Sequence, residues 1–228
     1  MDFTRILVIQ FKNNISGNEI PFFRGAVIHA LNEKANVLFH NHQEEKFRYS
    51  YPLIQYKKIQ GRAAIVCINE GTEAVGQFFS ACNFTFRLRD REVEMEIDSV
   101  KPQQFLVQVW DSVFHYCIRK WLPLNSENYQ KYNEMEGIGE KTAFMERILI
   151  GNILSFAKGI GVRLDKEVIC KLTGLRNYGL VDCKGVKLMA FDGEFRCNAS
   201  LPDFIGIGKN TSVGFGIITK VNNKKSYK

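Results

Sequence analysis

The chain has 228 residues, of which 45% are hydrophobic, and it carries a formal net charge of +7 at pH 7. This length suits one large domain or two of about a hundred residues, and the apolar content argues against wholesale disorder. The basic excess favours a polyanionic partner without requiring one. No apolar run approaches the length of a membrane span and the N-terminus lacks a signal-peptide pattern, so we expect a cytoplasmic protein that binds no membrane.

The six cysteines show neither a C-x-x-C pair nor a spacing with histidine that would suit a metal. Several fall in apolar, strand-like runs, as Cys67 does in the stretch AAIVCI. We interpret them as buried free thiols in a reducing cytoplasm. We expect neither a bound metal nor another cofactor.

The first hundred residues predict the order strand, helix, strand, strand, helix, strand. Apolar runs of strand length alternate with stretches whose apolar residues recur at helical spacing. This order is that of a ferredoxin-like domain that ends near residue 100, and the second unit is expected to open after KPQQ, residues 101–104. The predicted elements before the last strand are residues 5–12, 21–34, 49–59, 61–68 and 73–81.

Residues 84–98 alternate apolar and polar side chains and predict a β-hairpin. A two-residue turn at Asp90-Arg91 would place Arg87 opposite Glu94 on the solvated face, a favourable cross-strand pair. The acidic residues of this segment suit such a face better than a metal site. That face should also repel RNA.

The second half of the chain predicts another α+β unit that resembles the first in plan, with its second helix reduced or lost. Two strands are expected within 105–122, a loop over 125–137 and a broad apolar helix over 141–158. Residues 165–200 predict shorter strand pieces separated by glycines.

Residues 201–221 contain the most specific pattern of the chain. Gly206-Ile207-Gly208 is followed by five residues and then by Gly214-Phe215-Gly216. Four glycines in eleven positions predict a loop with positive φ angles and uncovered backbone N–H groups, as a phosphate-bearing partner would require. The spacing matches neither a Walker A loop nor a dinucleotide fingerprint, and a glycine-rich hairpin without a ligand is the alternative. The residues after the loop predict a buried strand.

The glycine pattern resembles the C-terminal signature of the RAMP superfamily of CRISPR-associated proteins, in particular the endoribonucleases that cut precursor CRISPR RNA within each repeat. This resemblance implies an α+β fold of tandem ferredoxin-like (RRM-like) domains: residues 1–103, and a degenerate second domain, 104–228, with a C-terminal Gly-rich loop. The implied RNA-binding residues are Gly206, Gly208, Lys209, Asn210, Thr211, Ser212, Gly214 and Gly216.

The same resemblance implies metal-independent cleavage that leaves a 2′,3′-cyclic phosphate and a 5′-hydroxyl. The partner is then CRISPR repeat RNA, and other CRISPR effector subunits are a second class of partner. The protein is expected to act as a monomer or homodimer. Two alternatives stay open. One is a non-catalytic RAMP subunit that binds guide RNA in an effector complex, and the other is a general single-stranded RNA-binding module.

Candidate catalytic residues follow from the chemistry of RNA cleavage. When the 2′-hydroxyl attacks the adjacent phosphorus, the protein must supply a base, an acid and cations, and histidine suits both proton roles. The family generally places a catalytic histidine at or after the end of the first helix, where this chain has His40 and His42. Tyr49 and Lys46 match the tyrosine and lysine that often accompany it. His29, on the predicted helix, is the competing histidine, and a plain surface loop is the alternative for the His40 segment.

Overall fold

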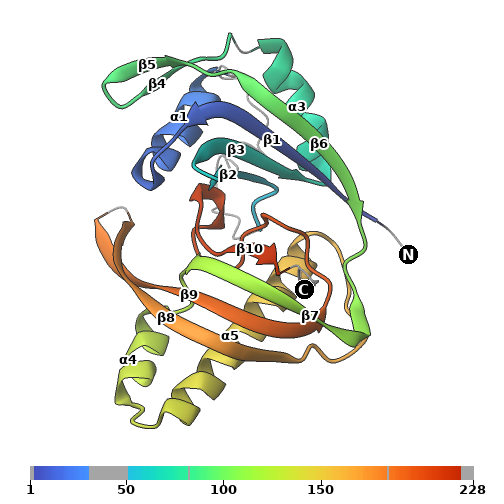
Figure 1. Cartoon of the computed structure of the whole chain (residues 1–228), viewed down its shortest axis with the longest axis vertical. Helices are drawn as coiled ribbons and strands as arrows, with labels where there is room; N and C mark the ends of the chain where they lie inside the picture. Colours follow the sequence, from blue (N-terminus) through green and yellow to red (C-terminus); the bar gives the residue numbers. More distant parts are fainter. Residues whose placement is uncertain (1–2, 31–50, 82, 184, 222–228) are drawn as a thin grey trace, which may run out of the picture. The chain divides into compact units, whose positions relative to one another are not determined.

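The structure is a computed structural model that describes residues 3–30, 51–81, 83–183 and 185–221. Each of its two compact units contains one four-stranded antiparallel sheet (Figure 1). Unit 1 comprises Met1–Leu106, Gly159–Gly161 and Thr211–Gly214, and unit 2 comprises Val107–Lys158, Val162–Asn210 and Phe215–Lys228.

The sheet of unit 1 has the strand order β2-β3-β1-β6, and every neighbouring pair is antiparallel. With a helix after the first strand and another after the third, this is the order of a ferredoxin-like domain, as predicted. The strands are β1 (Thr4–Asn14), β2 (Ile54–Ile59), β3 (Arg62–Ile68) and β6 (Ile97–Phe105), and the helices are α1 (Ile20–Ala30) and α3 (Glu70–Ala81), with a short 3-10 turn η1 (Gly17–Glu19) before α1.

One hydrophobic core joins α1 and α3 to the same face of this sheet. The apolar spacing that predicted α1 places Phe23 and Val27 at 0% exposure. The ring of Phe23 packs edge-on against Phe11 of β1 and Tyr56 of β2, with centroid distances of 5.6 and 5.7 Å. Edge-to-face aromatic pairs add to the stabilisation that burial itself provides, so α1 is firmly held.

The fourth strand of unit 1, β6, includes the segment KPQQ, after which the second unit was expected to open. Residues 101–104 lie in β6, where Pro102 is opposite Leu7 of β1. Proline is tolerated here because β6 is an edge strand of the sheet. β6 therefore continues past residue 100, near which the first domain was expected to end.

The predicted hairpin is present as a separate two-stranded sheet of β4 (Thr85–Leu88) and β5 (Arg91–Glu94). Its turn lies one residue earlier than predicted, so Arg87 is opposite Glu92 and not Glu94. A shift of the pairing by two residues leaves the same side chains facing inward, so alternation alone could not select the register. Arg89 in the turn has a φ of +55°.

The sheet of unit 2 has the strand order β10-β7-β9-β8, again fully antiparallel. In chain order this is the arrangement of unit 1, and it places the fourth strand beside the first. Between β9 and β10, all of whose intervening residues are described, there is no α-helix but only a short 3-10 turn, which confirms the prediction of a degenerate second domain. The elements are β7 (Val109–Trp121), α4 (Ser126–Glu134), α5 (Ile138–Gly159), β8 (Cys170–Cys183), β9 (Val186–Ala199), the 3-10 turn η2 (Thr211–Val213) and β10 (Ile217–Lys220).

Three details of unit 2 differ from the sequence-based expectation. Residues 126–134, expected as loop, form α4, because the Asn125 side chain caps it by accepting from the Asn128 N–H at 2.7 Å. The glycine-separated pieces join into two long strands, since register shifts at Gly174 and Gly179 absorb the irregular residues. The two strands expected within 105–122 form one strand, β7, after the end of β6.

Candidate functional site

The glycine-rich loop between β9 and β10 has the predicted left-handed backbone at three of its four glycines. The φ angles of Gly208, Gly214 and Gly216 are +92°, +86° and +63°, whereas Gly206 instead forms a bridge with Ile217. Residues other than glycine are strained at these positive φ angles. The loop therefore needs glycine for backbone reasons alone at these positions.

Packing provides a second reason for glycine. A Cβ at Gly216 would lie 1.9 Å from the carbonyl oxygen of Ile207, and one at Gly214 would lie 2.6 Å from Ile20 Cδ1. A Cβ at Gly208 would lie 3.0 Å from the Trp121 ring. The glycine pattern is thus required by the fold, whether or not the loop binds a ligand.

Several N–H groups of the loop form hydrogen bonds within the protein. Ile207 N–H donates to the Gly216 carbonyl at 2.9 Å, and Gly216 N–H donates to the Lys120 carbonyl at 3.1 Å. Lys209 N–H donates more weakly, at 3.4 Å, to the Leu122 carbonyl. The expectation of a run of uncovered N–H groups was therefore wrong for these three residues.

The side chains of the loop differ strongly in exposure. Lys209 and Asn210 are exposed, Ser212 is half-buried, and Thr211 is buried at 4% exposure. Asn210 also has a left-handed backbone, with a φ of +55°. The loop therefore exposes the ammonium group of Lys209 and the side-chain amide of Asn210 to solvent, and backbone hydrogen bonds hold it in place.

Lys57 of β2 is a buried cation that sequence reasoning did not single out. Its Nζ lies 3.5 Å from the carbonyl oxygen of Thr211, within unit 1, and its exposure is 0%. Desolvation by burial lowers the pKa of this lysine to about 7. The adjacent Lys58 is exposed, and no feature of the stretch IQYKKI distinguishes the two lysines in advance.

The candidate catalytic residues fall in a part of the chain that the structure does not describe. His40, His42, Lys46 and Tyr49 all belong to residues 31–50, which begin directly after the end of α1 at Ala30. They lie outside the described residues. Their assignment stays a prediction.

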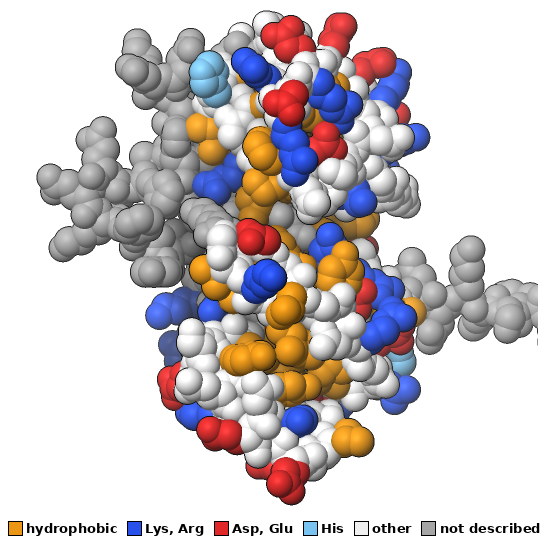
Figure 2. Space-filling view, turned by 90° about the vertical axis from the view of Figure 1, so that its left-hand side faces the viewer, with side chains coloured by type: hydrophobic (Ala, Val, Ile, Leu, Met, Phe, Trp, Pro, Cys, Tyr) orange, Lys and Arg blue, Asp and Glu red, His pale blue; other side chains and the backbone are white. Residues whose placement is uncertain are grey.

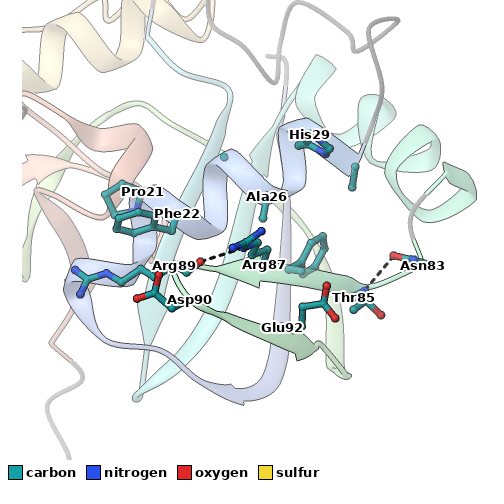
Figure 3. Close-up of a pocket in the computed structure, with 13 residues that line it drawn as sticks. Pro21, Phe22, Ala26, His29, Asn83, Thr85, Arg87, Arg89, Asp90 and Glu92 are labelled. Carbon is teal, nitrogen blue, oxygen red and sulfur yellow. Dashed lines mark hydrogen bonds between the residues drawn. The ribbon is translucent and has the colours of Figure 1, made fainter.

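His29, the competing histidine, lines an open cavity of about 1140 Å³ between α1 and the β4–β5 hairpin (Figure 3). The Arg89 guanidinium lies 4.9 Å from the centroid of the Phe22 ring, and Arg87 Nε donates to the Arg89 carbonyl at 3.4 Å. The remaining titratable lining residues are carboxylates of the hairpin, among them Glu92. Cleavage near neutral pH is favoured by a base and an acid whose pKa values lie near the working pH, and the described residues of this lining include a single histidine.

Charges of both signs are mixed on the face of the molecule shown in Figure 2, which includes the side of the hairpin. Arginine and lysine side chains lie among aspartate and glutamate side chains there instead of forming one basic field. Within the described residues, no group of histidine, cysteine, aspartate or glutamate has the geometry of a metal site. No helix in the described ranges combines the length and hydrophobicity that crossing a membrane requires.

Comparison with known proteins gives matches along nearly the whole chain. Family models described as the Cas6b N-terminal domain and the Cas6b C-terminal domain match residues 3–105 and 108–221. An uncharacterized protein of Methanocaldococcus jannaschii is 36% identical over 104 residues, which are 46% of this chain and 69% of the relative.

Solved structures agree with the family models. A crystal structure of Cas6b has a TM-score of 0.87 and 27% identity, covering 96% of this chain and 100% of that one. A second, of the CRISPR RNA processing endoribonuclease Cas6b, has a TM-score of 0.72 and 25% identity over 97% of this chain and 100% of that one. The Cas6 crRNA endonuclease Csf5 of a type IV CRISPR-Cas system shares the fold, with a TM-score of 0.57 and 15% identity over 96% of this chain and 100% of that one. The chain therefore belongs to the Cas6b family of CRISPR repeat-processing proteins.

Proposed function

We propose that this protein cleaves precursor CRISPR RNA within its repeats by a metal-independent mechanism, leaving a 2′,3′-cyclic phosphate and a 5′-hydroxyl. The observation that carries the proposal is the match of both halves of the chain to the two Cas6b domains, at residues 3–105 and 108–221. The family is one of CRISPR RNA-processing endoribonucleases, so the substrate class follows from membership.

In this mechanism His40 and His42 transfer the two protons. One takes the proton of the attacking 2′-hydroxyl, and the other gives a proton to the leaving 5′-oxygen. Lys46 stabilises the charge that develops on the phosphorane, and Tyr49 orients the nucleophile or donates to the phosphorane. The support is the place of the segment, which follows directly on α1, a helix held by the buried ring of Phe23.

The glycine-rich loop binds the RNA backbone in this proposal. The exposed side chains of Lys209 and Asn210 are the available phosphate ligands, with Ser212 half-buried beside them. Gly206, Gly208, Gly214 and Gly216 give the loop its shape, and Thr211 turns its carbonyl oxygen toward Lys57. Phosphate contacts of this kind position the RNA without reading its sequence.

The direct test is to incubate the protein with labelled repeat RNA in EDTA and to analyse the ends of the products. Cleavage at one position with a 2′,3′-cyclic phosphate is expected. Dependence on a divalent ion would overturn the metal-independent mechanism. Tight binding of processed RNA without scission would instead favour a non-catalytic guide-binding subunit.

Single substitutions assign the proton carriers. His40→Ala and His42→Ala should each slow cleavage by about 10²–10⁴-fold with RNA binding nearly unchanged, because a positioned proton-transfer group contributes on that scale. His29→Ala is the matched control on α1. If it alone abolishes cleavage, the active site is on the helix and the assignment to His40 and His42 is wrong.

We also propose that the protein works in the cytoplasm as a monomer or homodimer, with repeat RNA as its partner and other CRISPR effector subunits as a further class. Sedimentation of the purified chain with and without repeat RNA measures the oligomeric state. A larger assembly of this chain alone would contradict the proposal.

A further inference from the structure

Cys170 and Cys197 lie directly opposite each other on β8 and β9. The Asn198 N–H donates to the Ile169 carbonyl at 3.2 Å, so these two cysteines form a non-hydrogen-bonded pair of the antiparallel ladder. In such pairs the Cα atoms are about 4.5 Å apart and the two side chains lie close on the same face. This separation is within the range that a disulfide bridges, about 4.4–6.8 Å.

The sulfur atoms of the two side chains are also close to each other. The two sulfur atoms are 2.9 Å apart, and a disulfide bond is about 2.05 Å long, so bond formation requires a displacement of less than about 1 Å. Both residues are buried, at 2% and 1% exposure. A bond between them would be shielded from solvent reductants.

We propose that an oxidant joins Cys170 and Cys197, both free thiols in the structure, in a disulfide that cross-links the edge strand β8 to its neighbour β9. In a reducing cytoplasm the pair stays reduced. The ladder register singles out this pair. Cys67 is opposite Leu7 and Ile54, Cys117 is opposite Glu194 and Thr219, and Cys183 is opposite Val186. Among the described cysteines, only the pair at 170 and 197 is placed to bond within the chain.

The surroundings of the two sulfurs decide which one reacts first. Cys197 Sγ accepts from the Cys170 thiol and from the Ala199 N–H at 3.3 Å, and these hydrogen bonds lower the pKa of Cys197. Cys170 donates in this pair, is buried and lies near the Glu146 carboxylate, and all three effects raise its pKa. Cys197 is therefore the first thiolate.

The oxidant in this proposal is a low-molecular-weight disulfide. The Cys197 thiolate attacks one of its sulfurs, the bond of the small disulfide breaks, and one thiolate is released. That thiolate takes the proton of Cys170, whose sulfur then attacks the Cys197 sulfur and releases the second small molecule as a thiolate. This thiolate takes up the proton that Cys197 lost at the start. Two protein thiols are oxidised, and one small disulfide is reduced to two thiols.

Access to the buried pair comes from the edge of the sheet. Cys170 is the first residue of β8, and among the described strands β8 has a neighbour on one side only. Strand ends open at lower free energy than the middle of a sheet, so local fraying at Cys170 admits the oxidant. After bond formation this fraying is suppressed, because the strand end is covalently held.

The test treats the full-length protein with oxidised glutathione and then alkylates it in denaturant without reductant. Peptide mapping should find Cys170 and Cys197 unalkylated and linked to each other, while Cys117 of the same sheet is alkylated. The oxidised protein should unfold about 5–10 °C above the reduced one, because the bond restricts the unfolded chain. Full alkylation of both residues after oxidation would overturn the proposal.

Variants provide the matched control. Cys197→Ala should abolish the difference in Tm between oxidised and reduced protein, while Cys117→Ala should keep it. Cys170→Ala repeats the first measurement from the other strand, in case one variant folds poorly. If the difference in Tm persists in both variants of the pair, another bond causes it and the proposal is wrong.

Discussion

The two units have the same strand order but connect their third and fourth strands differently. In unit 1 the chain leaves β3, forms α3 and the hairpin, and then enters β6. In unit 2 it leaves β9 and passes through the glycine-rich loop, residues 200–216, before β10. The loop therefore occupies the topological position of the second helix.

The difference lies in where the backbone hydrogen bonds go. A helix such as α3 satisfies its N–H and C=O groups internally, whatever surrounds it. The loop instead pairs its Lys209 and Gly216 N–H groups with carbonyls at and beyond the end of β7, which requires close approach. Glycine is the only residue that allows this approach at Gly216, and the same arrangement leaves Lys209 exposed in a fixed position.

The largest effect is expected from Gly216→Ala. Its Cβ would lie 1.9 Å from the Ile207 carbonyl oxygen on a backbone with a φ of +63°, so unfolding by denaturant should show a loss of about 3 kcal/mol or more. A loss below about 1 kcal/mol would mean that the loop relaxes easily and that its glycines serve binding alone.

Lys57→Met should stabilise unit 1 near neutral pH by about 2–4 kcal/mol, because it removes the cost of burying an amine. The folded pKa is about 7 and the ordinary value is 10.5, so the unfolded chain binds the proton more tightly between these values. Stability of the parent should therefore rise with pH across this window. The full cost is present below pH 7.

The control is Lys58→Met, the exposed neighbour on the same strand. This variant should keep the rise of stability with pH that the parent shows, because Lys57 is still present. Denaturant unfolding at pH 6.5 and 9.5, about half a unit below and two and a half above the folded pKa, measures both variants. A gain from Lys57→Met that does not shrink at the higher pH would contradict the lowered pKa.

Lys209→Ala should weaken repeat-RNA binding by about 1 kcal/mol and reduce the salt dependence by about one phosphate contact, with the fold unchanged. The reason is that Lys209 is an exposed cation of a fixed loop. Lys166→Ala, which removes an exposed lysine paired with Asp111 in the same unit, should have a smaller effect. Equal losses of RNA affinity in the two variants would show that Lys209 contributes to binding only through its charge and not through its position in the loop.

The smallest effect is expected from Gly76→Ala in α3. An added Cβ at this position meets nothing within 4 Å, and alanine is favoured over glycine inside helices. The free energy of unfolding should therefore rise by about 0.5–1 kcal/mol. If Gly76→Ala lowered the free energy of unfolding as much as Gly216→Ala does, glycine would be required in the helix as strictly as in the loop, which contradicts this comparison.

Local patterns in the sequence were sufficient for the order of helices and strands in unit 1. The resemblance carried by the loop glycines implied the family and the ferredoxin-like plan of unit 2. The apolar run of β1, the helical spacing of Phe23 and Val27 in α1, and the spacing of the four loop glycines each report the conformation of a short segment. These sequence patterns follow from the local geometry of the backbone, so they can be recognised without knowledge of distant residues. The left-handed φ angles at Gly208, Gly214 and Gly216 were predictable for the same reason.

Only the tertiary structure decided which side chains are buried or paired and which loop N–H groups are hydrogen-bonded within the protein. The burial of Lys57 depends on Thr211, 154 positions later in the chain, and its neighbour Lys58 has the same side chain. The pairing of Arg87 with Glu92 depends on a register that alternation does not distinguish. The N–H groups of Lys209 and Gly216 are hydrogen-bonded because the end of β7 approaches the loop. Contacts between segments so far apart in the chain leave no periodic pattern in the local sequence.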